Sequence, residues 1–177
     1  MRDTNLAGAV LIIPPTFADD RGYFKESYVK TKYHALGITD EFVQDSLSCS
    51  SRGVLRGLHS DPVMSKLVYV VRGEVFDVIV DTRSDSATFG NWHGVELSEQ
   101  NGVQLYVPAG FLHGFLALTD DVIFCYKQSA EYAPGREIAV RFDDPTLGIE
   151  WPFSEELRVS PKDLRNPNFS EAFGKRR

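Results

Sequence analysis

The chain has 177 residues, 42% of them hydrophobic, which suits one domain over residues 1–177 with a substantial core. Its net charge is −6 and its pI about 5.2, so we expect no nucleic-acid partner. An anionic ligand would therefore need a local cluster of positive charge. The apolar patch at residues 7–13 ends at two prolines and is too short to span a bilayer, so it predicts a first strand and no membrane contact.

The N-terminal quarter predicts a turn, a strand, a helix and a second strand. Residues 19–22 form a turn signal, and the strand after it places Phe24 and Glu26 on one face. These two residues beside Arg21 could hold a nucleotide base, but this segment taken alone favours an ordinary edge strand. A helix is expected over residues 28–37, and a strand over residues 42–50 with Gln44 and Ser46 on one face.

The segment GVLRGLHSDPVMSKLVYVVRG, residues 53–73, contains the first candidate site. Strands are predicted at residues 54–58 and 66–71, with residues 59–65 as their connection. His59 would stand where a strand meets a loop, with Arg56 and Lys66 in the same segment. A titratable imidazole with two nearby cations is a candidate site for an anionic substrate. A hydrogen-bonded histidine at a strand end is the alternative.

Residues 66–128 consist of repeated short strands separated by Gly, Asn and Asp turns. This pattern predicts an all-β fold, a β-sandwich or barrel. Asp77 and Asp81 alternate with apolar residues and are interpreted as turn partners or surface charges, with site carboxylates as the alternative. Cys49 and Cys125 lie in apolar strand-like runs and are expected to be reduced core residues of a cytoplasmic protein.

Three later segments add candidate site residues. His113 follows the rigid turn of Pro108 and Gly110, beside apolar residues. The second segment, a strand and a Pro-Gly loop at residues 126–137, carries Tyr126, Tyr132 and Glu137. Residues 160–163, SPKD, resemble a capping box, so Asp163 could simply support the start of a helix.

Two of these segments keep the spacing of the cupin sequence motifs. Gly53, His59 and Gly73 match the frame of the first motif, and the run from Gly102 to His113 matches the second. The resemblance implies a cupin jelly roll with a few short helices. A metal cupin has a second histidine and a glutamate where this chain has Asp61 and Lys66. A protonated amine cannot ligate a metal, so no metal is expected.

Within the cupins, the chain is similar to the dTDP-4-dehydrorhamnose 3,5-epimerase family over almost its whole length. The similarity rests on DDRGYFKE, RGLH, KLV, GEVFDVIVD, PAGFLHGF, YK, LGIEWP and SPKD, in this order. It implies a homodimeric, cofactor-free epimerase of a nucleotide-linked 4-keto-6-deoxy sugar. The reaction needs a base, an acid on the other face of the sugar ring, and positive charge near the enolate oxygen.

The family resemblance also implies a role for each candidate residue. His59 would be the base, Asp163 its partner, Tyr126 the acid, and Lys66 the group that stabilises the enolate. His113 would line the sugar pocket. Diphosphate and nucleotide contacts would come from Arg56, from Arg21 of a neighbouring subunit, and from Phe24, Glu26, Gln44, Ser46 and Tyr132, with Glu137 and Lys162 in support.

Two local departures keep alternatives open. The family commonly has His-Tyr-Gln and a longer loop where this chain has residues 59–61 and a short connection to Lys66, and it has an asparagine in place of Ser46. A 3- or 5-mono-epimerase acting on a CDP- or GDP-linked sugar therefore remains an alternative. A metal cupin enzyme and a non-catalytic sugar-nucleotide binding module are the other two.

Overall fold

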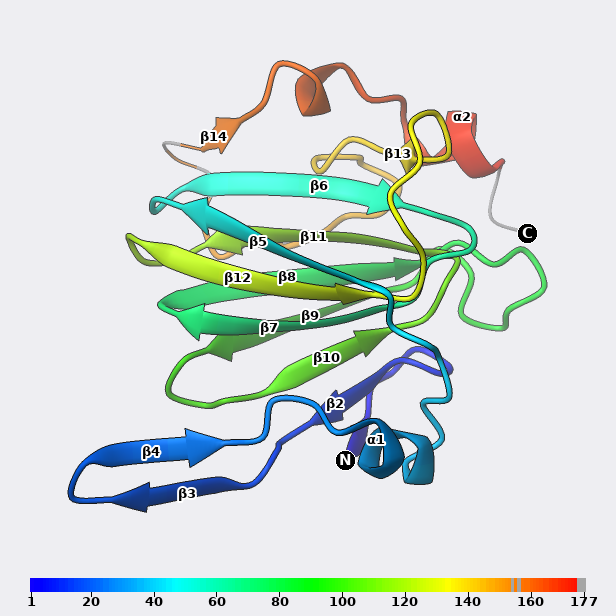
Figure 1. The fold of residues 1–177 in the computed structure, drawn as a ribbon. Coiled ribbons are helices and arrows are strands. Elements are labelled where there is room, and N and C mark those ends of the chain that lie inside the picture. The colour runs from blue at the N-terminus through cyan, green and yellow to red at the C-terminus, as the bar shows by residue number, and fades with distance from the viewer. Residues whose placement is uncertain (154, 156, 175–177) are drawn as a thin grey trace.

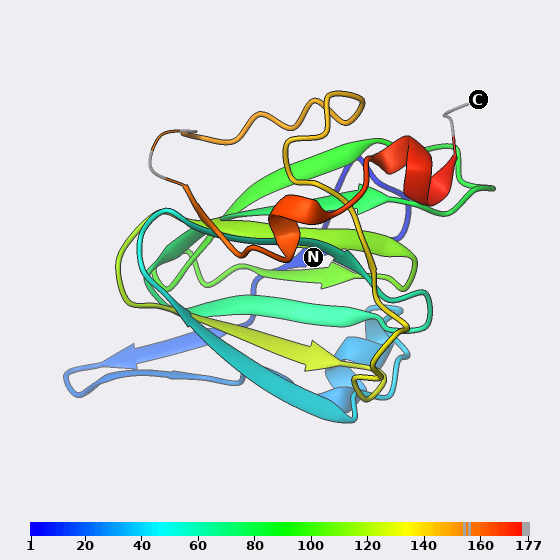
Figure 2. The same ribbon diagram turned by 90° about the horizontal axis from the view of Figure 1, so that it is seen from above.

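The computed structural model describes residues 1–153, 155 and 157–174, and within them β-strands predominate (Figures 1 and 2). The strands and helices in chain order are β1 (Arg2–Asp3), β2 (Val10–Ile12), β3 (Thr16–Asp19), β4 (Gly22–Lys25), α1 (Lys30–Ala35), β5 (Gln44–Ser50), β6 (Val54–Ser60), β7 (Lys66–Arg72), β8 (Glu74–Asp81), β9 (Trp92–Ser98), β10 (Gln104–Val107), β11 (Phe111–Ala117), β12 (Val122–Gln128), β13 (Ile138–Ala139), β14 (Arg158–Val159), the 3-10 helix η1 (Asp163–Arg165) and α2 (Phe169–Phe173).

Two sheets pack face to face, as Figure 1 shows. In the described residues, the first has the order β1-β2-β10-β7-β12-β5. The second has the order β13-β6-β11-β8-β9, with β14 beside β6. The core between them includes the stacked rings of Phe115 and Phe124, whose centroids lie 4.4 Å apart. The all-β jelly-roll prediction is confirmed.

The second sheet is covered on both faces. A cluster on its outer face joins Leu58, Val78 and Leu112 to Phe169 of α2. Figure 2 shows the C-terminal segment crossing over this sheet. Because both faces are covered, every residue of β11 is buried, and strands of this kind have continuous apolar runs without alternation.

A close approach of two strands determines where the site histidine lies. Gly57 in β6 has a φ of +120°, and a Cβ atom there would lie 2.6 Å from the Gly114 Cα atom of β11. Only glycine fits this conformation and this gap. The register shifts between His113 and Phe115, and His59 then lies opposite His113.

The strands β3 and β4 form a separate hairpin that projects away from the two sheets (Figure 1). They follow the turn predicted at residues 19–22, and their pairing matches Phe17 with Phe24. Both aromatic side chains are exposed. Among the described residues, no helix is long and apolar enough to cross a membrane.

Several local predictions need correction. Residues His59 and Ser60 belong to β6 and not to a connection, because β13 pairs with them. Cys49 is exposed because it lies with Asp45 and Leu47 on the uncovered face of β5, although both cysteines are free thiols as expected. Asp77 is fully buried against His113 and is not a surface charge. Asp81 is also fully buried, and there it is the turn partner that the sequence predicts.

Candidate active site

A histidine–aspartate pair lies at the end of β6. The Nε2 atom of His59 lies 2.6 Å from Oδ1 of Asp163, and its Nδ1 atom lies 3.8 Å from Oε2 of Glu137. Asp163 is buried, whereas the side chain of His59 keeps 27% of its surface exposed. Because Asp163 occupies Nε2, Nδ1 is the nitrogen left to take a proton from a ligand.

Strand pairing brings Asp163 to His59 across more than a hundred residues of sequence. β14 pairs with β6 in parallel, with Arg158 opposite Val54. Five residues further along each segment stand Asp163 and His59. The amide of Asp163 donates to Ser160 Oγ at 3.0 Å, which is one of the two bonds of the predicted capping box. The Asp163 carboxylate contacts His59 and accepts from Asn166 Nδ2 at 3.4 Å.

The first sheet contributes Tyr126 and Lys66 to the opposite wall. β12 pairs with β7 so that Tyr126 lies opposite Val68 and Gln128 opposite Lys66. Burial raises the pKa of Tyr126 to about 12, so the phenol keeps its proton at neutral pH. Its hydroxyl lies 3.4 Å from Ser48 Oγ.

Lys66 is a half-buried cation near three carboxylates. Burial lowers the pKa of its ammonium, while the charges of Glu137, Asp61 and Asp77 oppose that shift. A compact ammonium in such a site is suited to stabilise a developing oxyanion.

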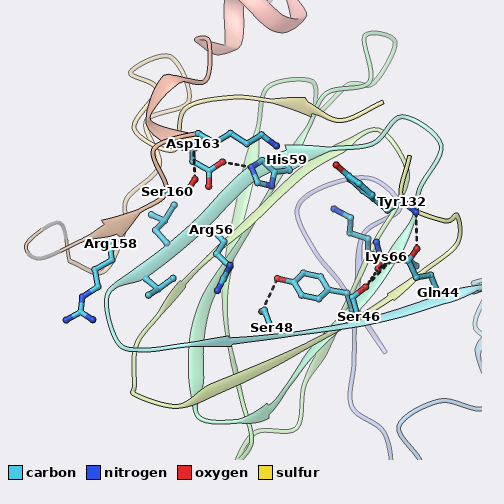
Figure 3. Close-up of a pocket in the computed structure, with 15 residues that line it drawn as sticks. Gln44, Ser46, Ser48, Arg56, His59, Lys66, Tyr132, Arg158, Ser160 and Asp163 are labelled. Atoms are coloured by element: carbon cyan, nitrogen blue, oxygen red, sulfur yellow. Dashed lines mark hydrogen bonds and ion pairs between the residues drawn. The ribbon is translucent and has the colours of Figure 1, made fainter. Parts of the chain in front are cut away.

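These groups share one cavity of about 540 Å³ (Figure 3). Figure 3 shows His59 beside Asp163 on one side of it, Lys66 on another, and Arg56 on the side of His59 away from Lys66. The predicted residues that line this cavity are Gln44, Ser46, Arg56, His59, Lys66, Tyr126, Tyr132, Lys162 and Asp163.

One end of the cavity carries a network of amides and hydroxyls. The side chain of Gln44 donates to Ser46 Oγ and to Gln128 Oε1, each at 3.1 Å. Ser46 Oγ also donates to Gln128 Oε1 at 2.8 Å, and the amide of Tyr132 donates to Gln44 Oε1 at 2.9 Å. Gln44 and Ser46 thus share one face of β5, as predicted, and present groups that can hydrogen-bond a polar ring.

Cations lie along the rest of the cavity wall. Arg56 donates through Nε to Ser50 Oγ at 3.0 Å and through Nη2 to the Cys49 carbonyl at 3.1 Å. Lys162 forms an ion pair with Glu137 at 2.5 Å, beside His59. The positive charge that an acidic chain needs for an anionic ligand is therefore local to this cavity.

Five predicted residues lie outside the cavity lining. Arg21 pairs with Asp19 at the hairpin tip, Phe24 is exposed on β4, and Glu26 pairs with Lys32. Within this single chain, the hairpin residues do not reach His59. Glu137 is absent from the lining, and its carboxylate lies 3.8 Å from Nδ1 of His59 and is paired with Lys162.

His113 is the fifth of these residues. It is buried in β11, with its Nε2 atom 2.9 Å from Asp77 Oδ2, and its ring stands edge-on to Tyr126 with centroids 6.2 Å apart. Burial raises the pKa of Asp77. Because the ring of His113 is buried and packs against Tyr126, His113 supports Tyr126 from behind and does not contribute to the cavity surface.

Further polar residues line the cavity that the sequence did not single out: Ser48, Gln128, Arg158 and Ser160. Alternation could have found two of them, since Ser48 follows Ser46 and Gln128 follows Tyr126 by two residues along a strand. Arg158 had no such signal, because its strand is two residues long.

The cupin metal positions do not form a ligand set in the described residues. Asp61 is paired with Arg136 at 2.6 Å, His113 with Asp77, and Lys66 is an amine. No group of three or more His, Cys, Asp or Glu side chains that could hold a metal is found in this part of the chain.

The paired histidine, the protonated phenol and the ammonium define a site for proton transfer at a carbon acid. The model of one family, dTDP-4-dehydrorhamnose 3,5-epimerase, matches residues 3–171. The dTDP-4-dehydrorhamnose 3,5-epimerase of Methanothermobacter thermautotrophicus is 46% identical over 164 residues, covering 90% of this chain and 89% of that protein.

Two solved structures share the fold closely. The dTDP-6-deoxy-D-glucose-3,5-epimerase of Legionella pneumophila in complex with dTDP-4-keto-L-rhamnose is 42% identical with a TM-score of 0.92, over 99% of this chain and 97% of that one. A 3′-monoepimerase of Streptomyces bikiniensis in complex with dTDP-quinovose is 34% identical with a TM-score of 0.91, over 98% of this chain and 91% of that one.

The chain belongs to the dTDP-4-dehydrorhamnose 3,5-epimerase family. It is therefore an epimerase of the isomerase class, and the resemblance found in its sequence motifs is confirmed.

Proposed function

We propose that this protein inverts C3 and C5 of a nucleotide-linked 4-keto-6-deoxy sugar, with dTDP-4-dehydro-6-deoxyglucose as the expected substrate, and uses no cofactor. The observation that carries the proposal is the 2.6 Å contact of His59 with Asp163 in one cavity with Tyr126 and Lys66. The substrate's own ketone acidifies the adjacent C–H bonds, so positioned acid and base groups suffice.

His59 is the base in this mechanism. Its Nδ1 atom takes the proton from the carbon next to the ketone, and the electron pair of that bond forms an enolate. The carboxylate of Asp163, at Nε2, orients the ring and stabilises the imidazolium that results.

The other two groups stabilise the enolate and return a proton. The ammonium of Lys66 stabilises the negative charge on the enolate oxygen. Tyr126 stands on the wall opposite His59, and its phenol gives a proton to the other face of the carbon, which inverts the centre. A pKa of about 12 keeps this phenol protonated until the carbanion forms.

The nucleotide and diphosphate fit the remaining features of the cavity. Arg56 supplies charge for the diphosphate, and Gln44, Ser46 and Tyr132 supply hydrogen bonds and an aromatic ring for the nucleotide. Lys162 and Glu137 support this wall through their ion pair.

We propose a homodimer in which the hairpin of a second subunit completes the site. Phe17 and Phe24 on the hairpin, Val43 just before β5 and Leu47 on β5 leave large apolar surfaces exposed. Burying this surface in a dimer would place Arg21, Phe24 and Glu26 of one subunit over the cavity of the other. The free thiols of Cys49 and Cys125 are consistent with a cytoplasmic protein.

Proton NMR in D₂O with dTDP-4-dehydro-6-deoxyglucose tests this function. Deuterium at both C3 and C5, with inverted products, is the expected result. Binding of this substrate without deuterium at either position would support a non-catalytic module. If the substrate does not bind, the CDP- and GDP-linked sugars are tested in the same way, and exchange with one of them would reassign the carrier.

Mono-epimerisation at C3 or C5 is the second candidate. A 3′-monoepimerase shares this fold with a TM-score of 0.91, and the turn between His59 and Lys66 is shorter here than the family commonly has. Deuterium at only one of the two carbons would support this candidate.

A further inference from the structure

Asp61 and Arg136 form an ion pair beside the cavity, although neither residue lines it. The Nε atom of Arg136 donates to Asp61 Oδ2 at 2.6 Å, and the side chains are 30% and 10% exposed. The second carboxylate oxygen of Asp61 accepts from the amide of Val63 at 3.1 Å, which fixes the short turn after β6.

The other end of Arg136 closes the loop at residues 131–137. Its Nη2 atom donates to the Glu131 carbonyl at 2.6 Å. This loop presents Tyr132 to the cavity and leads directly into Glu137, which contacts His59 and Lys162. The ion pair therefore joins the turn that precedes Lys66 to the loop at residues 131–137, which carries Tyr132 and Glu137.

We infer that Asp61 and Arg136 are positioning residues, whose ion pair holds Glu137 on the Nδ1 side of His59 and Tyr132 at the nucleotide end of the cavity. The inference deepens the proposed function and rests on it. Asp61 stands at a position where a metal cupin has a ligand, so this chain uses that position to hold a loop.

Asp61 also contributes charge to the site. Its carboxylate is one of three that oppose the loss of the Lys66 proton. Removing the Asp61 charge should lower the pKa of Lys66 further, and the alkaline limb of kcat/KM should then move to lower pH. A residue that only stabilises the fold would not move this limb.

A double-mutant cycle tests the pair: Asp61→Asn, Arg136→Gln and the double variant, each assayed by kcat, KM and deuterium exchange. Each single variant should lose about tenfold or more in kcat/KM, because small misplacements of catalytic groups are costly. The double variant should lose no more than a single one, since a single variant leaves one buried charge without its partner and the double variant does not.

The control is Arg83→Gln, which breaks another Arg–Asp pair of similar burial that lies away from the cavity. It should lower the thermal midpoint and leave kcat/KM and its pH profile unchanged. Additive losses in the double variant, or an alkaline limb that Asp61→Asn leaves unmoved, would overturn the inference. A wild-type protein that exchanges no deuterium with any of the sugars would instead refute the proposed function.

Discussion

Lys66 places a charge where burial disfavours it. Its pKa is lowered from the ordinary 10.5 in the folded chain, so the unfolded chain binds more protons at alkaline pH. Folding stability should therefore rise as the pH increases from the folded pKa of Lys66 towards 10.5. The charged ammonium of Lys66 thus lowers the stability of the fold, as is typical of a residue whose charge serves the reaction.

Replacing this lysine should separate activity from stability. In Lys66→Met, we expect kcat to fall by about a hundredfold or more, because the enolate loses its cation. The thermal midpoint at neutral pH should not fall, because the buried charge is gone. Lys30→Met, which removes an exposed ammonium paired with Glu41, is the control for both measurements. An unchanged kcat in Lys66→Met would contradict the assigned role.

At the scale of elements, the C-terminal segment positions the carboxylate. Phe169 is 1% exposed in the cluster on the outer face of the second sheet, together with Leu58, the neighbour of His59. The backbone amide of Phe169 donates to Asp144 Oδ2 at 2.8 Å. This anchor holds α2, and with it the segment from β14 through Asp163, against β6.

Loosening this anchor should weaken both the fold and the catalytic pair. Phe169→Ala should cost about 3–5 kcal/mol of unfolding free energy in a denaturant titration. At a temperature where the variant is folded, kcat should fall more than KM changes, because Asp163 is held less firmly. Leu6→Ala, in the core between the sheets, should lose stability and keep its kcat. Equal effects on kcat in both variants would contradict this account.

The β3–β4 hairpin is the element whose proposed role needs a second subunit. Its strands pair only with each other in the described sheets, so the body should fold without it. Replacing residues 17–24 by two glycines should give a monomer in light scattering. The KM should rise about tenfold or more, because the site loses its partner residues.

A point variant makes the same test with less disruption. Phe24→Ser should weaken the dimer, whereas Val63→Ser, at another exposed apolar residue, should leave it intact. A dimeric deletion variant with an unchanged KM would show that the hairpin does not complete the site.

At the scale of the molecule, the sequence predicted the strands and the strand faces that depend on local patterns of apolar and turn residues. The strands between residues 66 and 128 follow from their apolar runs and turn residues, and the shared face of Gln44 and Ser46 follows from alternation. The family motifs identified nine of the residues that line the cavity.

Long-range pairing explains what the sequence did not predict. His59 lies within a strand because β11 pairs with it on one side and β13, eighty residues later, on the other. Cys49 is exposed because nothing in the described chain covers the outer face of β5, and the sequence of that strand does not reveal which face is covered. Asp77 is buried because His113 lies beside it on the next strand. The Asp61–Arg136 pair joins two loops far apart in sequence, and no local pattern indicates it.

The central claim is that His59 removes the proton from one face of the sugar and Tyr126 returns one to the other. The most direct measurement is proton NMR in D₂O on His59→Ala and Tyr126→Phe, reading deuterium and configuration separately at C3 and C5. Tyr126→Phe should incorporate deuterium without inversion, because His59 can return a solvent-derived deuteron to the face it deprotonates, and His59→Ala should incorporate none. Deuterium in His59→Ala, or full inversion in Tyr126→Phe, would contradict the account.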